Sequence, residues 1–543
     1  MELLLATHPY VDAGTVNGEI VATGEMDHSS SFAVNPPTYA DGMIFVGLAE
    51  GCVQAFSAET LESLWIYRDE LGGQPNCTIY YHDGYIYTGF WLGEVVDANY
   101  VCLSVTDEDP TKDKEEKIPT WTYTSKGGFY WAGAFVNDDF VIIGTDDGAA
   151  GYTTGKGRVV TFSTKTGEVI DEITMPNAGD IRSGIVYDEN ADEYYFSSKG
   201  GYFYGLKVEK DGKIMDSSLR YIRLDNGQNI ATAPPMSTST PCVYNQRAYV
   251  GVSGISQFGP YSGHNICVLD LKNWEVAYTV PTQGYPQTSG ILTTAYEEES
   301  GCVYVYFIDN YTPGKLRVIS DKPNQTRPSE MTTESFTSGG KTTSYDTAYV
   351  IFTPDGDQAQ YAICSPIVDE YGTIYFKNDS AYLMAIGSTI DKITIENLPD
   401  KLSYDEGEAF EAAGMKVVAT YSNGLTRDVT KYVSYSKQPL TVDDTSLEIR
   451  YECVKYQDKD GQAGSLYTPP IAFVELEVKG KAPEISAEEC DLNDDGKINS
   501  DDFSMVLMNY GMKQTLSDVN NDGIIDVKDI SVLLGHYGKV IKE

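Results

Sequence analysis

Two twelve-residue segments near the C-terminus carry oxygen-bearing side chains at the spacing of a calcium-binding loop. They begin at Asp491 and Asp518, and both have such side chains at positions 1, 3, 5, 9 and 12, with a glycine at position 6. Calcium is a hard cation that takes about six to eight oxygen ligands, and position 7 needs to offer only its backbone carbonyl. The sequence therefore predicts one calcium ion in each segment. The predicted ligands are Asp491, Asn493, Asp495, the Lys497 carbonyl, Asn499 and Asp502 in the first loop, and Asp518, Asn520, Asp522, the Ile524 carbonyl, Asp526 and Asp529 in the second.

The residues that follow each loop are apolar and predict helices that hold the loops in place. Residues 503–511 and 530–538 both end in Tyr-Gly, so the duplication extends beyond the loops themselves. Ile498 and Ile525, at loop position 8, are expected to form a short β-contact between the two loops. The segment before Asp491 is too short and irregular to form a helix that enters the first loop.

This arrangement, with aspartate at position 12 and no entering helix, resembles the type I dockerin, a module that binds cohesin domains of a cellulosome-like scaffold. The resemblance implies folding that depends on calcium, because without the metal the ligand side chains crowd two short loops. It also implies that loop positions 10 and 11 face the cohesin. These are Ser500 and Asp501 in the first copy but Val527 and Lys528 in the second, which argues against interchangeable binding through either copy.

From residue 1 to about residue 388 a three-residue apolar strand core recurs, and in six of seven copies its centre is aromatic. Four of the six intervals between centres span 53–55 residues, and short strands at such a period are typical of a propeller or solenoid. We predict seven blades, with eight as the alternative. The last repeat lacks an outer strand, which the N-terminal stretch up to Met26, including residues 19–23, could supply. The cores are centred on Phe45, Tyr87, Ile142, Tyr195, Tyr249, Tyr304 and Tyr375.

Several strand cores are followed by a second strand, a turn and a third strand, as around Trp65, and this pattern resembles the pyrroloquinoline-quinone-like β-propeller repeat. That family includes quinone-dependent alcohol dehydrogenases, which use an adjacent pair of cysteines and several intact tryptophan motifs. No two of the nine cysteines are adjacent here, and only the motif at Trp65 is complete. The quinone cofactor and dehydrogenase activity are therefore disfavoured, since a fold alone is no warrant for activity.

Residues 389–480 carry alternating apolar strands separated by turn residues, a pattern typical of a β-sandwich. The order Tyr404 to Phe410, followed by Gly414-Met415, is similar to bacterial immunoglobulin-like surface domains, which usually serve as spacers. We therefore expect a multidomain, mainly β protein. Its expected parts are a propeller over 1–388, an immunoglobulin-like β-sandwich over 389–480 and a small α-helical dockerin over 481–543.

Aromatic residues in the propeller loops are candidates for stacking on sugar rings, because one face of a sugar presents apolar C–H groups. The alternative for the same propeller is a glycoside hydrolase or polysaccharide lyase, which needs two carboxylates facing each other across a cleft. Nothing in the local sequence distinguishes a catalytic pair among the many acids, which include Asp146, Asp147, Asp309 and Glu370. The predicted stacking residues are Trp91, Trp131, Tyr261 and Tyr311.

The composition limits the partners. A formal net charge of −41 repels nucleic acid and anionic membranes. No apolar run approaches the length of a transmembrane helix, so membrane insertion is not expected. The nine single cysteines suit small buried positions, and outside the cell they are tolerable only in a reducing, anaerobic habitat.

These patterns together predict a secreted component of a cellulosome- or amylosome-like complex of an anaerobic bacterium, either extracellular or attached to the cell surface through a scaffoldin. Its signal peptide would have been removed. The dockerin would bind a cohesin, and the propeller would bind starch, another plant polysaccharide or a protein. The sequence does not decide whether the propeller is an enzyme, and it favours a non-catalytic role.

Overall fold

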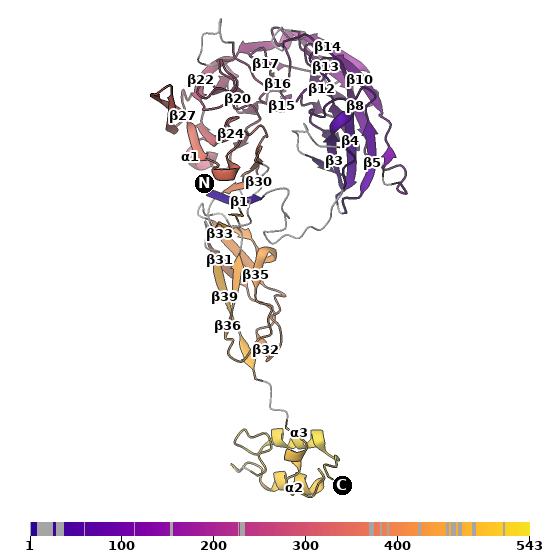
Figure 1. The fold of residues 1–543 in the computed structure, drawn as a ribbon, viewed down its shortest axis with the longest axis vertical. Helices are drawn as coiled ribbons and strands as arrows, with labels where there is room; N and C mark the ends of the chain where they lie inside the picture. Colours follow the sequence, from indigo (N-terminus) through magenta and orange to yellow (C-terminus); the bar gives the residue numbers. More distant parts are fainter. Residues whose placement is uncertain are drawn as a thin grey trace. The chain divides into compact units, whose positions relative to one another are not determined.

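The computed structural model shows a mainly β protein in which two short helices occupy the C-terminal segment (Figure 1). The chain forms two compact units, one of Met1–Ile393, Ala419–Arg427 and Tyr451–Pro470, the other of Thr394–Val418, Asp428–Arg450 and Ile471–Glu543. In the described part of the chain, no helix is long and apolar enough to cross a membrane. The structure describes residues 2–7, 25–28, 37–58, 60–112, 114–151, 156–225, 227, 234–368, 374–380, 383–387, 390–421, 424, 426–451, 456–457, 463–464, 470–480, 485–513 and 516–542.

Within the described residues up to 387, seven sheets of four or five strands follow one another around an arc (Figure 1). The first four sheets contain β2 Thr38–Ala40, β3 Met43–Leu48, β4 Cys52–Ser57, β5 Ser63–Arg68 and β9 Glu115–Glu116; β6 Tyr80–His82, β7 Tyr85–Gly89, β8 Asp97–Ser104 and β10 Trp121–Lys126; β11 Phe135–Val136, β12 Phe140–Gly144, β13 Arg158–Ser163 and β14 Val169–Thr174; and β15 Val186–Asp188, β16 Glu193–Ser197, β17 Tyr202–Leu206 and β18 Arg220–Arg223.

The last three sheets follow the same plan, and the sixth carries an additional hairpin strand. They contain β19 Cys242–Tyr244, β20 Arg247–Val252, β21 Asn265–Asp270 and β22 Glu275–Pro281; β23 Ile291–Thr293, β24 Val303–Ile308, β25 Leu316–Asp321, β26 Met331–Ser338 and β27 Lys341–Phe352; and β28 Ile367–Val368, β29 Ile374–Lys377, β30 Leu383–Gly387 and β1 Glu2–Thr7. A single helical turn, α1 Glu297–Ser300, precedes β24.

The seven predicted strand cores all lie in the second strand of a sheet, from β3 to β29. The number of sheets equals the number of blades predicted, and the propeller-like arrangement is confirmed by the strand pairing itself. Each sheet also has a first strand that was not predicted. That strand is only two or three residues long, which is too short for an alternating pattern to show in the sequence.

The N-terminus supplies the outer strand of the seventh sheet. β1 pairs antiparallel with β30, from Glu2 opposite Gly387 to Thr7 opposite Leu383. The prediction that the N-terminal stretch completes the last repeat is therefore confirmed, with residues 2–7 in this role. Residues 19–23, suggested for it from the sequence, lie outside the described residues. Pairing the N-terminal strand with the last repeat of the propeller-like unit protects an edge that would otherwise be open.

Buried side chains fill the space between successive sheets. Phe45 and Trp65 of the first sheet, for example, pack with Ile86 and Leu103 of the second. The Trp65 indole N–H donates to the Val105 carbonyl at 3.2 Å, so the outer strand of one sheet is fixed to the next. Trp121 repeats this contact one sheet further on, donating to the Thr164 carbonyl at 3.1 Å.

The strands of each sheet are antiparallel to their neighbours along the order from first to fourth. The turn from the second to the third strand therefore lies at the same edge as the connection to the next sheet. We call the surface formed by these turns and connections the loop face. It contains the segments that carry the candidate ligand-binding residues of the propeller.

The segment between the propeller sheets and the calcium loops folds into small sheets. Tyr404 and Phe410, which carried the resemblance to immunoglobulin-like domains, are both buried, with ring centroids 6.1 Å apart. The sheets are β31 Ile390–Asn397, β33 Lys416–Tyr421 and β34 Thr426–Asp428; β35 Val433–Tyr435, β36 Ser446–Tyr451 and β39 Ile471–Glu475; the parallel pair β32 Ser403–Asp405 and β40 Glu477–Lys479; and β37 Tyr456–Gln457 with β38 Ala463–Gly464.

The C-terminal segment contains α2 Ser500–Met508 and α3 Val527–His536. Each helix begins three residues earlier than predicted, because loop position 9 serves as its N-cap. The Asn499 and Asp526 side chains accept from the backbone N–H of Asp501 and Lys528, both at 2.7 Å. Capping by asparagine or aspartate satisfies amide groups that the first helical turn leaves unbonded.

Candidate functional site

The two predicted calcium loops have the same internal geometry. The carboxylate at position 1 accepts from the backbone N–H groups at positions 5 and 6: for Asp491 at 3.0 and 2.8 Å, and for Asp518 at 3.1 and 2.8 Å. Gly496 and Gly523 have φ of 83° and 91°, a left-handed conformation that favours glycine. The sharp turn that brings positions 1, 3 and 5 around one point is therefore present in both loops.

The aspartate at position 12 closes each loop. Asp502 is fully buried and accepts from the N–H groups of Leu492 at 2.8 Å and Asn499 at 2.9 Å. Asp529 is equally buried and accepts from Asn520 at 3.1 Å and Asp526 at 2.8 Å. Burying a carboxylate is costly unless it is paired with a cation or well hydrogen-bonded. Both loops thus bury a carboxylate at position 12, one of the positions predicted to ligate calcium.

The predicted β-contact between the loops is wrong. Ile498 donates to the Lys539 carbonyl at 3.0 Å and accepts from Gly538 at 2.8 Å, both of which follow α3. Ile525 makes the corresponding pair of bonds with Gly511 and Met512, which follow α2. The chain turns back after each Tyr-Gly and bonds to the loop of the other repeat. The Ile498 and Ile525 side chains still share one buried core, so the two repeats fold as a unit.

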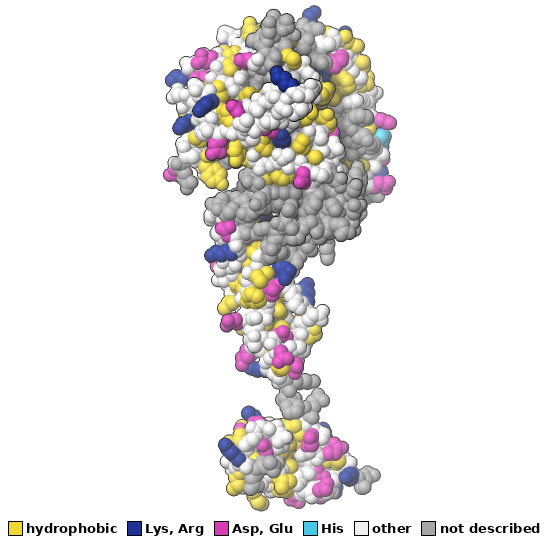
Figure 2. All heavy atoms as spheres, turned by 60° about the vertical axis from the view of Figure 1, so that its left-hand side comes forward, with side chains coloured by type: hydrophobic (Ala, Val, Ile, Leu, Met, Phe, Trp, Pro, Cys, Tyr) yellow, Lys and Arg dark blue, Asp and Glu magenta, His cyan; other side chains and the backbone are white. Residues whose placement is uncertain are grey.

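The four residues predicted to face a cohesin lie at the start of the helices and are all exposed: Ser500, Asp501, Val527 and Lys528. Val527 is 60% exposed, and Leu534, two turns along the same side of α3, is 55% exposed. The Lys528 ammonium donates to the Asp522 carboxylate at 3.0 Å, whereas no ion pair to Asp501 occurs among the described residues. Figure 2 shows hydrophobic side chains on the surface of this segment.

On the propeller, all four predicted stacking residues lie in loops of the loop face. The structure brings Trp91 and Trp131 together through Tyr130, whose ring centroid is 4.8 Å from that of Trp91 and 4.6 Å from that of Trp131. Tyr261 and Tyr311 are not part of this group. Tyr261 stacks at 4.3 Å on Tyr345 of the β26–β27 hairpin, which occupies one face of its ring.

Tyr311 belongs to the same face but has a different neighbour, with its ring perpendicular to that of Tyr361 at a centroid distance of 6.4 Å. The aromatic group suited to a ligand is therefore Trp91, Tyr130 and Trp131. Tyr130 is the member that the sequence analysis did not select. Its contact with Trp91 depends on how two neighbouring sheets pack, which the sequence alone does not show.

A buried ion cluster, which the sequence did not predict, supports this aromatic group. The Arg182 guanidinium Nη2 lies 2.6 Å from Asp146, 2.9 Å from Asp180 and 3.1 Å from Glu94, and its carbon is 4.6 Å from the Tyr130 ring centroid. Ligand atoms of the three acids lie within 4.8 Å of one another, the one such group of acid, histidine or cysteine residues in the described part. Arg182 already pairs with all three acids, so its own charge is compensated from within the chain.

Burial shifts the protonation of this cluster. It raises the pKa of Asp180 to about 6 and that of Asp146 well above its ordinary value, against the opposing effect of Arg182. Burial also lowers the pKa of Lys199 to about 8, helped by the like charge of Arg182. Of the other carboxylates considered for catalysis, Asp147 adjoins the cluster, because its backbone N–H donates to the Asp180 carboxylate at 3.0 Å. Asp309 lies elsewhere, buried against Arg317 at 2.6 Å, and Glu370 lies outside the described residues.

Asp180 should make the propeller less stable at neutral than at acid pH. Its pKa is higher folded than unfolded, so the folded state holds more protons between pH 4 and 6, and stability falls as pH rises through that window. Relative to Asp180→Asn, the wild type should lose about 1–3 kcal/mol between pH 4 and pH 7. Urea unfolding followed by tryptophan fluorescence measures this, since all five tryptophans precede residue 275. A constant difference between the two proteins would contradict the assignment.

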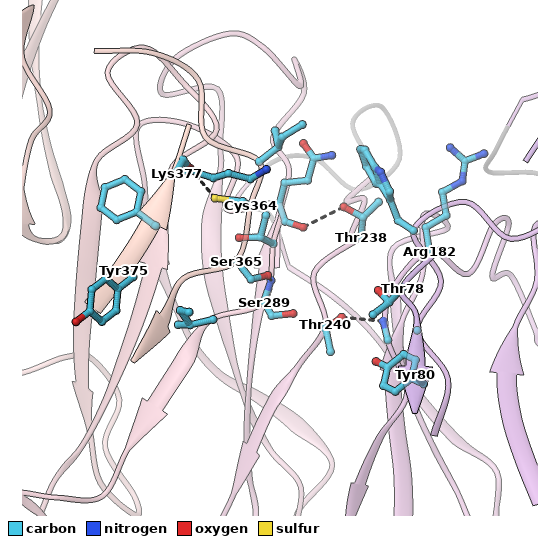
Figure 3. Close-up of a pocket in the computed structure, with 18 residues that line it drawn as sticks. Thr78, Tyr80, Arg182, Thr238, Thr240, Ser289, Cys364, Ser365, Tyr375 and Lys377 are labelled. Carbon is cyan, nitrogen blue, oxygen red and sulfur yellow. Dashed lines mark hydrogen bonds between the residues drawn. The ribbon is translucent and has the colours of Figure 1, made fainter. Parts of the chain in front are cut away.

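A cavity of about 400 Å³ lies beside Trp131 and Arg182. Its wall comes mainly from the connections and first strands of six of the seven sheets, with a part of β29 in the seventh. Figure 3 shows Cys364, Ser365, Ser289 and Thr240 following one another across it toward Thr78 and Tyr80. The sequence signal for this wall is a short polar stretch before the first strands of the second, fourth, fifth, sixth and seventh sheets. It was not recognised, because the first strands themselves were not predicted.

The fold and site therefore define a mainly β protein with a propeller-like unit and a C-terminal pair of acidic loops. No protein-family model and no curated protein matches the sequence. Among solved structures, the crystal structure of BamB from Moraxella catarrhalis is similar with 12% identity and a TM-score of 0.41, over 65% of this chain and 82% of that one. At this level the likeness carries no argument about function.

Proposed function

We propose that this protein is a non-catalytic component of an extracellular, cellulosome-like complex, joined to it by a calcium-dependent dockerin and carrying a glycan-binding propeller. The main support for docking through the C-terminal segment is the geometry shared by the two acidic loops. In both copies the same five side-chain positions surround one turn, and the buried Asp502 and Asp529 close it. Calcium would be held by the twelve predicted ligands and would join each loop to its helix.

The second loop and its helix α3 form the better docking surface. Val527 and Leu534 form an apolar strip on α3, and the adjacent Gly535 has no side chain that would block the approach of a partner. The corresponding side of α2 instead presents Asp501 and the side chain of Met508, which is 77% exposed. Interface centres favour apolar residues and are depleted of unpaired acids. We therefore assign cohesin binding to the α3 side, with Val527 and Lys528 in the contact.

The loop face supports binding rather than catalysis. A hydrolase needs two carboxylates that reach the substrate, but Asp146 and Asp180 are buried and bonded to Arg182. Among the described residues that line the cavity, none is acidic. The aromatic group of Trp91, Tyr130 and Trp131 instead offers flat, half-buried rings, braced by Arg182. Such rings suit the apolar faces of sugars, and the ligand proposed is starch or a plant cell-wall polysaccharide.

Retention on insoluble polysaccharide tests the propeller part. The wild type should be retained on at least one of starch, cellulose and xylan without release of soluble sugar, and Trp131→Ala should weaken retention about ten-fold by loss of one stacking ring. Trp274→Ala is the matched control, because Trp274 lies in the turn before β22, outside the loop face. Release of soluble products would favour the hydrolase alternative. If Trp131→Ala leaves retention unchanged, the aromatic group is not the binding site.

A further inference from the structure

The cavity beside Trp131 has the chemistry of a site for one small ligand. We propose that it binds a short neutral saccharide, so that the propeller recognises a chain end or a free oligosaccharide. This inference rests on the proposal that the propeller binds glycans, and it names where and in what form. The volume of about 400 Å³ falls in the range of small-molecule sites. Because the wall comes from six sheets around one space, the site suits an end that enters and not a polymer that crosses.

The wall offers hydroxyl and amide groups whose hydrogen-bonding capacity is only partly used. The Thr240 hydroxyl accepts from the Gly184 N–H at 2.7 Å, which leaves its own proton free to donate. The Gln287 side-chain carbonyl accepts from Asn310 at 2.8 Å, which leaves its NH₂ group for a ligand. A hydroxyl that both donates and accepts matches a sugar hydroxyl, which does the same.

Other polar atoms at the wall lack partners. The Trp131 indole N–H and the Thr288 hydroxyl are shielded from solvent and have no hydrogen-bond partner among the described residues. A buried polar group without a partner is costly and calls for an explanation. A small rotation of either side chain would let it bond to a ligand in the adjacent cavity. The indole ring would then also cover the apolar face of a sugar.

The charges at the wall favour a neutral ligand. The chain contains 80 acidic residues, yet none is among the described residues that line the cavity, so these residues offer a divalent cation no carboxylate ligand. Of the two lining cations, Arg182 is neutralised by three carboxylates. The other, Lys377, is exposed, and a single exposed charge contributes little to binding an anion. Hydroxyl recognition therefore remains as the main source of affinity.

Cys364 provides a reporter inside the cavity. Its thiol is half-buried at the wall and donates to the Lys377 carbonyl, as Figure 3 shows. Reaction of the full-length protein with N-ethylmaleimide, read by peptide mass spectrometry, measures each cysteine separately. We expect at least one of maltotriose, cellotriose and xylotriose, at about 10 mM, to slow labelling of Cys364 by about five-fold or more. Cys242, half-buried in β19, should label at an unchanged rate and serves as the internal control.

Thr78→Val and Ser365→Ala each remove one hydroxyl from the wall with little change in volume, and each should abolish most of the protection. If none of the three sugars protects Cys364, or if only the acidic trigalacturonate does, the inference is wrong. Protection that survives both substitutions would also contradict it. Retention on polysaccharide with an unprotected Cys364 would defeat this inference and leave the proposed function standing. Protection without retention would keep this inference and the binding of glycans, but it would limit the ligand to free oligosaccharides and remove insoluble polysaccharide from the proposed function.

Discussion

Replacing Asp502 and Asp529 together by alanine should abolish calcium binding and unfold the C-terminal segment while the propeller stays folded. Each aspartate closes a loop, caps a helix and would bind the ion, so its loss removes three functions at once. Chelation of the wild type should have the same effect. A ligand at about 100 times its Kd stabilises a fold by about 2.7 kcal/mol, and two ions add to nearly the whole stability of so small a core.

Hydrogen exchange followed by mass spectrometry measures this effect. Amides of α2 and α3 should exchange at least about ten-fold faster without calcium, whereas peptides of the propeller sheets should be unaffected. Asp501→Ala is the matched control, because Asp501 is adjacent, exposed and at a position that is not a predicted ligand. Tryptophan fluorescence should not change, since no tryptophan follows Trp274. If exchange in both helices is indifferent to calcium, the loops are not the switch described here.

The second large effect is expected at the surface of α3. The double substitution of Val527 and Leu534 by aspartate should weaken cohesin binding at least about 100-fold, because it places two charges at the centre of an apolar contact. The corresponding double substitution of Ser500 and Leu507 by aspartate on α2 should change binding less than about three-fold. Surface plasmon resonance on an immobilised cohesin compares the two variants with the wild type.

This comparison separates one-sided from two-sided docking. Both variants alter exposed residues at equivalent positions of the two repeats, so any general loss of solubility or folding should affect them equally. Equal loss of affinity in both would show that the two helices bind together. Full binding by both would show that either helix can substitute for the other, contrary to the asymmetry argued from Val527 and Asp501.

The sequence was most informative where a pattern is local. The turns of the two acidic loops could be located from the sequence, because the relevant residues lie within twelve positions of one chain segment, and calcium binding by them stays a prediction. The second strands of the propeller sheets were also identified, since an apolar core with an aromatic centre repeats at a steady period. The helices were placed three residues late, because the ligand at position 9 doubles as an N-cap, a role that spacing alone does not reveal.

Features that join distant segments could not be predicted in the same way. Arg182 meets Glu94 and Asp146 across sheet connections 88 and 36 residues apart, and no local pattern marks such a cluster. The contact expected between Ile498 and Ile525 failed for a related reason. Their backbone groups are bonded by the segments after the helices, and only the fold shows where those segments return.

Capture of the full-length protein by immobilised type I cohesins, with calcium and then with EGTA, tests the central claim most directly. The account predicts that at least one cohesin binds the protein in calcium, releases it in EGTA and binds it again when calcium is restored. A protein that no cohesin captures, or whose capture is the same in EGTA, would contradict the assignment of the C-terminal loops as a calcium-dependent docking module.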